Sequence, residues 1–339
     1  MRTIPEYRGI SAERFRSEIV PLGRPAVLRG AVENWPLVER GRASPAALVD
    51  YLSSFDSGLL VGTVTAPPQE GGRLFYREGE RALNFNVSSE KLPSVLKGIL
   101  KQMDSPAPWA VAMQGVSAAD HLPGLQGENP IDLVPAGTGA RLWIGNQVTV
   151  APHFDVADNV ACVAAGRRRF TLFPPDQLPN LYLGPFDVTP AGVPVSMVPL
   201  DDPDLERFPR HRDALEAAES AELEPGDAIF IPHMWWHGVQ SQGAFNLLVN
   251  YWWNAGPVAA EHPYGALLHA AFLLYRDMPP GQRAIWRGMY DYYVFESHGD
   301  PLAHLPPELR SEARTVDPKA IAGLKSALAA LLDEDEEGT

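Results

Sequence analysis

Two residues with metal-binding side chains, His153 and Asp155, lie two positions apart in a run that has the composition of a β-strand. Successive side chains of a strand point to opposite faces, so this imidazole and this carboxylate would project side by side. Two histidines and one carboxylate on one face of a metal are typical of non-haem Fe(II) sites, which leave the other positions open. The sequence thus offers two of three ligands here, and His237, much later in the chain, is the predicted third.

Each of these assignments has an alternative. A surface pair is the alternative for the first two residues. For the third ligand the rival is His233, because His-x-x-x-His brings two histidines together when both lie on a helix. The run Pro232-His-Met-Trp-Trp-His237 favours extended chain instead, since it contains a proline and neighbouring aromatic residues. We therefore predict His237 as the ligand, with Trp235 on its face of the strand and Trp236 on the other.

Further motifs surround these residues in a fixed order, and together they resemble the JmjC and cupin-like family of Fe(II)- and 2-oxoglutarate-dependent oxygenases. The resemblance runs from about Gly9 to Trp253 and is strongest to the branch containing the asparaginyl hydroxylase of hypoxia-inducible factor. Each motif is weak alone, but the ordered set is specific. In chain order the motifs are His153-Phe-Asp155 with Asn159, Gly166-Arg-Arg-Arg169, Leu172-Phe-Pro-Pro175, Pro225-Gly-Asp227, Ile231-Pro-His-Met-Trp-Trp-His237 and Asn250-Tyr-Trp252.

The resemblance implies a mainly β fold, a double-stranded β-helix or jelly roll with flanking helices, over residues 1–255. It also implies Fe(II) and 2-oxoglutarate as cofactors, with succinate and CO₂ released as a substrate is hydroxylated. The substrate would be a protein side chain or a small molecule. Two other classes stay open: a metal-binding cupin that binds or isomerises a small ligand without 2-oxoglutarate, and a catalytically silent binding module.

Such a site needs one cation, because 2-oxoglutarate has a distal carboxylate that would be costly to bury unpaired. The hypoxia-factor hydroxylase has a lysine at the position of Arg168, and a planar guanidinium can pair with both carboxylate oxygens at once. In a strand, Arg168 shares a face with Phe170 and Leu172, whereas Arg167 and Arg169 point to the other side. The alternative is that all three arginines are solvated surface charges.

The resemblance assigns four more residues to the cosubstrate pocket, namely Gln114, Asn159, Asn250 and Trp252. Local sequence leaves a turn residue at Asn159 and core packing of Trp252 as alternatives. The family has a tyrosine two positions before the glutamine, and this chain has Ala112 there. One expected contact to the cosubstrate is therefore missing.

The elements that must position these residues are short strands separated by turns. Of 339 residues 45% are apolar, and 33 Pro and 29 Gly favour many short elements over a helical bundle. Alternating β-branched and aromatic residues from Leu142 to Phe173 indicate paired strands. Ser88 and Ser89 predict the start of a helix that runs to Ile99. We expect His211–Ala221 to be a short surface helix with its histidine exposed.

From about Gly256 the periodicity becomes helical, so we predict a C-terminal helical segment over residues 256–339. The resemblance implies that such helices pair two subunits as a homodimer, and a helical cap on the chain's own barrel is the alternative. An acidic run, Asp333–Glu337, is predicted to be disordered. The expected helices are His262–Tyr275, Pro280–Tyr293 and Asp317–Leu332, the last with an apolar stripe of Ile321, Leu324, Leu328 and Leu331.

Charge and composition limit the partners and the location. The formal net charge is -14, and Arg167–Arg169 is the only run of three basic residues. Such a chain repels a phosphate backbone, so no nucleic-acid partner is expected. The sequence contains no long apolar run and no signal-peptide pattern, so we predict no membrane association and a cytoplasmic location. A single cysteine, Cys162, cannot form an intrachain disulfide, which fits a reducing compartment.

Overall fold

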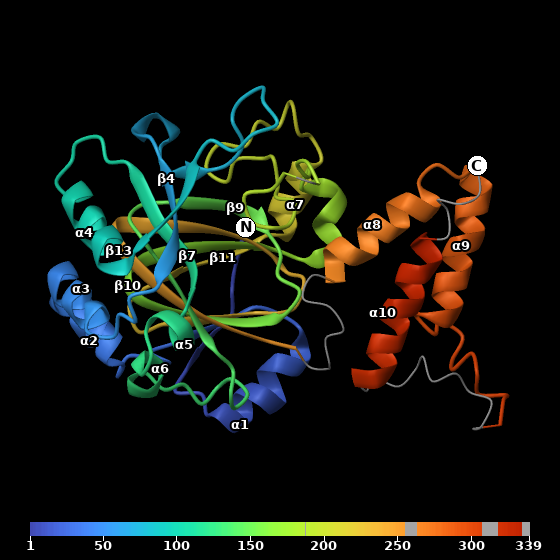
Figure 1. Cartoon of the computed structure of the whole chain (residues 1–339), viewed down its shortest axis with the longest axis horizontal. Coiled ribbons are helices and arrows are strands. Elements are labelled where there is room, and N and C mark those ends of the chain that lie inside the picture. The colour runs from blue at the N-terminus through green and yellow to red at the C-terminus, as the bar shows by residue number, and fades with distance from the viewer. Residues whose placement is uncertain (187, 255–262, 307–317, 334–339) are drawn as a thin grey trace. The chain divides into compact units, whose positions relative to one another are not determined.

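The computed structural model describes residues 1–186, 188–254, 263–306 and 318–333 (Figure 1). The chain divides into two compact units, Met1–Asn254 and Ala255–Thr339, and each is considered by itself. All candidate site residues lie in the first unit. None of the described helices combines the length and the apolar content that crossing a membrane would require.

A large, mostly antiparallel sheet with flanking helices forms the first unit, which confirms the predicted mainly β, cupin-like jelly roll. Its longest path runs β2-β3-β12-β10-β13-β8-β7-β4-β6 and does not close on itself. The described strands are β1 Arg2–Thr3, β2 Glu6–Arg8, β3 Ala26–Arg29, β4 Leu60–Ala66, β5 Arg73–Leu74, β6 Asn86–Lys91, β7 Ala110–Ser117, β8 Ala140–Gly145, β9 Thr149–His153, β10 Asp158–Phe173, β11 Glu219–Leu223, β12 Ala228–Ile231 and β13 Trp236–Trp253.

Helices flank this sheet, and in Figure 1 α2, α3 and α4 lie together along one side of it. Of these, α2 packs on β10, and α4 packs on β7 and β13. The described helices of the first unit are α1 Ala12–Arg14, α2 Pro36–Ala43, α3 Pro45–Ser53, α4 Leu92–Gln102, α5 Ala118–His121, α6 Leu125–Glu128 and α7 His211–Ala217, with shorter π or 3-10 turns at Phe15–Ile19, Val20–Leu22, Pro68–Glu70 and Pro175–Asn180.

The two longest strands, β10 and β13, pair in antiparallel fashion along their whole length, from Asp158 opposite Trp253 to Phe173 opposite Trp236. The first part of β13 also pairs with β9, and its second part pairs with β8. On its other side β10 pairs with β12 and then with β11. Of the candidate ligands, His153 ends β9 and His237 lies on β13, whereas Asp155 lies in the short connection between β9 and β10 and not in a strand with His153 as predicted.

A glycine bulge in β10 sets the direction of the arginine run. The β10–β13 register shifts on both sides of Ala165, and Gly166 has φ +71°, a conformation that side chains rarely adopt. A Cβ there would also lie 2.1 Å from the Oδ1 atom of Asn246. Beyond the bulge Arg167 is exposed and Arg168 is buried, so the predicted alternation is confirmed.

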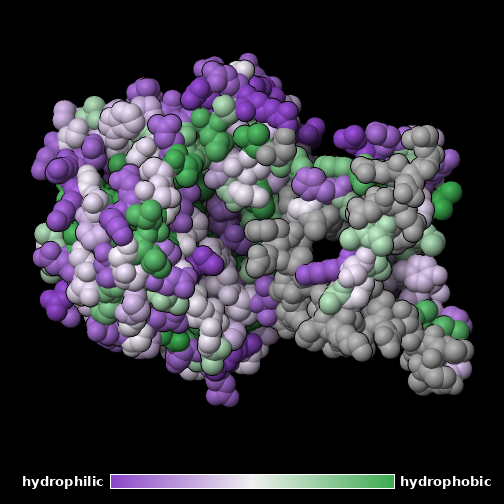
Figure 2. Space-filling model, in the orientation of Figure 1, coloured by the Kyte–Doolittle hydropathy of each residue, from purple (hydrophilic) through white to green (hydrophobic). Residues whose placement is uncertain are grey.

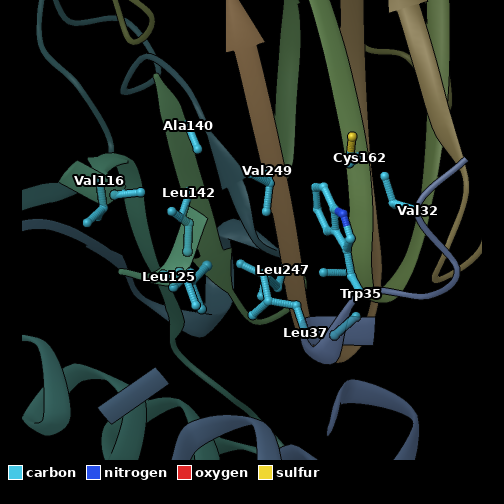
Figure 3. Close-up of a cluster of buried hydrophobic side chains, with 14 of the residues drawn as sticks. Val32, Trp35, Leu37, Val116, Leu125, Ala140, Leu142, Cys162, Leu247 and Val249 are labelled. Atoms are coloured by element: carbon cyan, nitrogen blue, oxygen red, sulfur yellow. The ribbon is translucent and has the colours of Figure 1, made fainter. Parts of the chain in front are cut away.

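The main apolar core lies between the sheet and helices α2, α3 and α4, and Figure 3 shows part of it. Trp35, at the start of α2, packs edge-on against Tyr251 of β13, with ring centroids 6.4 Å apart. Cys162 of β10 is fully buried in the same cluster. Burial of this apolar surface fixes the β10–β13 pair against the helices.

Three local predictions were wrong. Ser88 and Ser89 lie in β6, and α4 begins only at Leu92 with Pro93 in its first turn. Pairing with β4 overrides the local capping signal there. The helix predicted at His211–Ala221 ends at Ala217 and is followed by β11. His211 is buried, not exposed, and its ring packs beside Phe173.

The second unit contains the described helices α8 Pro263–Tyr275, α9 Pro280–Tyr293 and α10 Pro318–Asp333. The predicted first residues His262 and Asp317 lie outside the described residues, as do residues 334–337 of the acidic run. In the predicted stripe only the side chain of Leu328 is described, and it is exposed. Pairing of two subunits through these helices stays a prediction.

On the face shown in Figure 2, hydrophilic residues of the first unit are spread among small groups of hydrophobic ones. Scattered apolar residues of this kind are normal on a folded surface. The apolar residues of this unit are concentrated instead in the buried clusters of the sheet and its helices.

Cys162 provides a chemical test of this core. Burial raises the pKa of its thiol, and thiolate is the reactive form, so the native protein should not react with a thiol reagent at pH 8. One thiol per chain should react after denaturation, as counted by absorbance of the released chromophore. Stoichiometric labelling of the native protein would contradict this packing.

Candidate active site

His153, Asp155 and His237 converge on one point, where one ligand atom from each lies within 4.8 Å of the others. His153 ends β9, and it lies directly opposite His237 on β13. The two imidazole rings have centroids 4.3 Å apart, and Nε2 of His237 is 3.6 Å from Oδ2 of Asp155. This cluster of two histidines and one carboxylate could hold a divalent metal ion.

Backbone carbonyls orient both imidazoles. Nδ1 of His153 lies 3.0 Å from the carbonyl oxygen of Ala151, and Nδ1 of His237 lies 3.1 Å from that of Trp235. A carbonyl only accepts, so each Nδ1 carries a hydrogen and each Nε2 is the ring atom available to a metal. Burial, with the neighbouring His237, lowers the pKa of His153 to about 4. His153 is therefore neutral at neutral pH, as a metal ligand must be.

A relay of polar side chains fixes the carboxylate. Oδ2 of Asp155 accepts hydrogen bonds from Nε1 of Trp252 at 2.9 Å and from Nδ2 of Asn159 at 3.3 Å. Oδ1 of Asn159 in turn accepts from Nδ2 of Asn250 at 3.1 Å. The β10–β13 register explains why these side chains meet. Asn159 lies opposite Trp252, and Asn250, two residues before Trp252, points to the same face of β13. These donors orient a candidate ligand in the way that outer hydrogen bonds orient metal ligands.

Arg168 is a buried cation without an anionic partner among the described residues. It is 6% exposed, Nη2 donates to the carbonyl oxygen of Trp143 at 3.3 Å, and Nε has no hydrogen-bond partner. Burial lowers the pKa of Arg168 to about 10, so the guanidinium remains charged at neutral pH. An unpaired buried charge is costly, which marks this place as one prepared for an anion.

The triad and Arg168 face one cavity of about 370 Å³. Gln114, Asn159, Asn250 and Trp252 line the same cavity, so the structure brings all of the predicted site residues together. Its walls contain the polar residues Gln114, His153, Asp155, Asn159, Arg168, His237 and Asn250 and the apolar residues Trp143, Val150, Phe170, Pro190, Ala191, Gly192, Ile231, Val239, Leu248 and Trp252.

Two residues that the sequence analysis considered for the site, His233 and Ala112, do not line the cavity. His233 is exposed, and it is its backbone N–H that donates to Asp158, so its side chain does not join the triad. Ala112 packs in a small apolar cluster with Val64, Leu74 and Val148. Its methyl group cannot supply the hydroxyl contact that a tyrosine would give.

Two parts of the cavity wall lie outside the sequence motifs. Trp143 lines it from β8, with its ring edge-on to Trp252 at 6.1 Å and its Nε1 atom buried without a partner. Pro190–Gly192 line it from the long connection between β10 and β11. Neither Trp143 nor Pro190–Gly192 belongs to a sequence motif, so only the fold shows that they line the cavity.

Comparison with known proteins gives a family model and several relatives. Residues 12–258 match the model described as a cupin-like domain. The chain is 28% identical over 273 residues to tRNA wybutosine-synthesizing protein 5 of Gallus gallus, covering 75% of this chain and 78% of that one. It is 27% identical to human HSPB1-associated protein 1 and 26% identical to lysine-specific demethylase 8 of Xenopus tropicalis. These matches cover 71% and 74% of this chain, but only 50% and 53% of the two relatives.

Metal binding should depend on the triad. Replacing His153, Asp155 or His237 with Ala should abolish tight Fe(II) binding, since each removes one of three ligands on one face. His233→Ala is the matched control and should bind Fe(II) as the wild type does, because its side chain is exposed. Anaerobic calorimetric titration measures all four variants. Retained binding in His237→Ala with loss in His233→Ala would reverse the assignment.

Proposed function

We propose that this chain, which belongs to the cupin-like domain family, is an Fe(II)- and 2-oxoglutarate-dependent oxygenase. JmjC and cupin-like relatives are typically enzymes of this class, and the resemblance predicted from the motifs is confirmed. The proposed outcome is hydroxylation of a C–H bond, with O₂ consumed and succinate and CO₂ released.

The observation that carries the proposal is the unpaired guanidinium of Arg168 in the cavity that also contains the triad. A metal-binding cupin without 2-oxoglutarate needs no buried cation there. A dicarboxylic cosubstrate does need one, because its distal carboxylate must be paired inside a poorly solvated site. The residues present thus fit a 2-oxo acid that chelates the metal and ends in a carboxylate.

In this proposal each residue of the chain has a physical task. His153, Asp155 and His237 would hold Fe(II), and Trp252 and Asn159 keep the Asp155 carboxylate in position through their hydrogen bonds. Arg168 fixes the far end of the cosubstrate. The bound metal and 2-oxoglutarate together supply the oxidising chemistry. The apolar walls of the cavity limit access of water to it.

Pro190–Gly192 line part of the cavity in which a substrate would bind. The substrate that we propose is the one predicted from the sequence, a protein side chain or a small molecule. We propose no nucleic-acid partner. The structure supports this last point in one respect. Of the only run of three basic residues, Arg168 is buried, so the run does not form a continuous basic surface.

Turnover tests the reaction class directly. Wild-type protein loaded with Fe(II) should convert 2-oxoglutarate to succinate on exposure to O₂, slowly alone and faster with substrate-containing cell extract. Asp155→Ala should form none, because it lacks a ligand. Succinate measured by mass spectrometry decides the result. A wild type that binds Fe(II) but forms no succinate under either condition would favour the metal-binding cupin or the silent binding module.

Arg168 should control cosubstrate affinity and not metal affinity. Removing it leaves a buried anion unpaired, at a cost of about 3–5 kcal/mol by analogy with broken buried ion pairs. Arg168→Ala should therefore weaken 2-oxoglutarate binding at least about a hundredfold while Fe(II) binding is retained. Arg168→Lys should recover part of the affinity.

The matched control is Arg167→Ala, which removes the neighbouring exposed guanidinium and should change little. Anaerobic titration of each Fe(II)-loaded protein with 2-oxoglutarate gives the four dissociation constants. Near-normal affinity in Arg168→Ala would mean that this cation does not bind the cosubstrate.

A further inference from the structure

Ser241 lies beside Arg168 at one end of the cavity. The two residues are directly opposite each other in the β10–β13 pair. Directly opposite residues of an antiparallel pair project from the same face, with Cβ atoms about 4.5–5.5 Å apart. The next pair on this face is Phe170 with Val239, and both of these line the cavity. Ser241 is therefore placed one step beyond the cavity wall, next to the guanidinium.

The hydroxyl of Ser241 is buried without a hydrogen-bond partner among the described residues. The residue is 3% exposed and Oγ has no donor or acceptor within reach, although its backbone N–H donates to the carbonyl oxygen of Val148 at 2.8 Å. Most buried polar side-chain atoms in native proteins are paired. An unpaired hydroxyl beside a cavity therefore indicates a partner that arrives with a ligand.

The neighbouring guanidinium has the same deficiency. Nε of Arg168 is buried and unpaired, and its one hydrogen bond is to the carbonyl oxygen of Trp143. Arginine has no acceptor atom, so it needs an acceptor from elsewhere. A serine hydroxyl can donate to an anion that the arginine also binds. One carboxylate between the two side chains would satisfy both of them.

Ser241 and Arg168 matter together because this chain has Ala112 where the resemblance predicts a tyrosine. Ala112 offers no hydroxyl, and it belongs to the same apolar cluster as Val148, whose carbonyl accepts from the Ser241 backbone. The hydroxyl that β7 lacks is thus available from β13, in the same part of the fold. In this arrangement the hydroxyl donor beside Arg168 comes from β13 and not from β7.

We propose that the Ser241 hydroxyl donates a hydrogen bond to the distal carboxylate of 2-oxoglutarate, beside the guanidinium of Arg168. This inference rests on the proposed function, because it assigns a contact within the same cosubstrate site. Ser241 and Arg168 together select 2-oxo acids that end in a second carboxylate over those that end in a methyl group.

The test compares two ligands on Fe(II)-loaded protein under anaerobic conditions. 2-Oxoglutarate has the distal carboxylate, and 2-oxovalerate has the same chelating end but terminates in a methyl group. Ser241→Ala should weaken 2-oxoglutarate binding about tenfold to a hundredfold, the range for a hydrogen bond to a charged group. It should leave 2-oxovalerate binding unchanged, because that ligand cannot use the hydroxyl. Ser241→Thr keeps the hydroxyl and should restore much of the affinity.

Thermal unfolding without ligand separates this role from a structural one. Ser241→Ala removes an unpaired buried hydroxyl, so its melting temperature should not fall. Ser196→Ala is the matched control, because the Ser196 hydroxyl is also buried but donates to Leu181 at 2.6 Å and accepts from the backbone of Val198. That variant should melt at a lower temperature.

Three results would overturn the inference. If Ser241→Ala binds 2-oxoglutarate as tightly as the wild type while Arg168→Ala loses affinity, the proposed function stands and Ser241 has no part in it. Equal losses of 2-oxoglutarate and 2-oxovalerate would instead indicate general damage to the site. A wild type that binds neither ligand would overturn the proposed function, and the inference with it.

Discussion

The antiparallel pairing of β10 with β13 is the constraint on which the site depends. It places Asn159 opposite Trp252, Arg168 opposite Ser241 and Leu172 opposite His237. A shift of one residue would turn each of these side chains to the other face of the sheet. The register irregularities around Ala165 and the positive φ of Gly166 lie between Asn159 and Arg168 along β10. They therefore determine which face of the strand each of these two side chains occupies.

The polar groups of the cavity fall into two sets with different energetic roles. The relay from Asn250 through Asn159 to Asp155, with Trp252, is linked by hydrogen bonds within the protein and orients the Asp155 carboxylate, while Oδ1 of Asn250 has no partner among the described residues. Around Arg168, by contrast, donors are left unpaired. A buried group without a partner reduces the stability of the folded state. Such an arrangement is preorganised for an anion. Binding of an anion would pair these donors and so recover the stability that the folded protein loses without it.

The long connection between β10 and β11 lies against the candidate site. Its residues Pro190–Gly192 line the cavity, and neighbouring Val195 packs against Phe75, Tyr76 and Ala151. Ala151 belongs to β9, the strand that ends in His153. The strand that ends in the candidate ligand His153 therefore both lines the cavity and packs against this connection.

The sequence by itself determined the residue types of the metal triad, the parity that buries Arg168 and the β-rich fold, because strand alternation is a local property. It also showed that the tyrosine hydroxyl is missing at Ala112. Tertiary structure alone decided which groups lie near Arg168, since strand pairing across distant segments places Ser241 opposite it and lets the carbonyl oxygen of Trp143 accept its hydrogen bond. The same non-local pairing overrode the helix signal at Ser88 and buried His211, because contacts between distant residues outweigh local propensity.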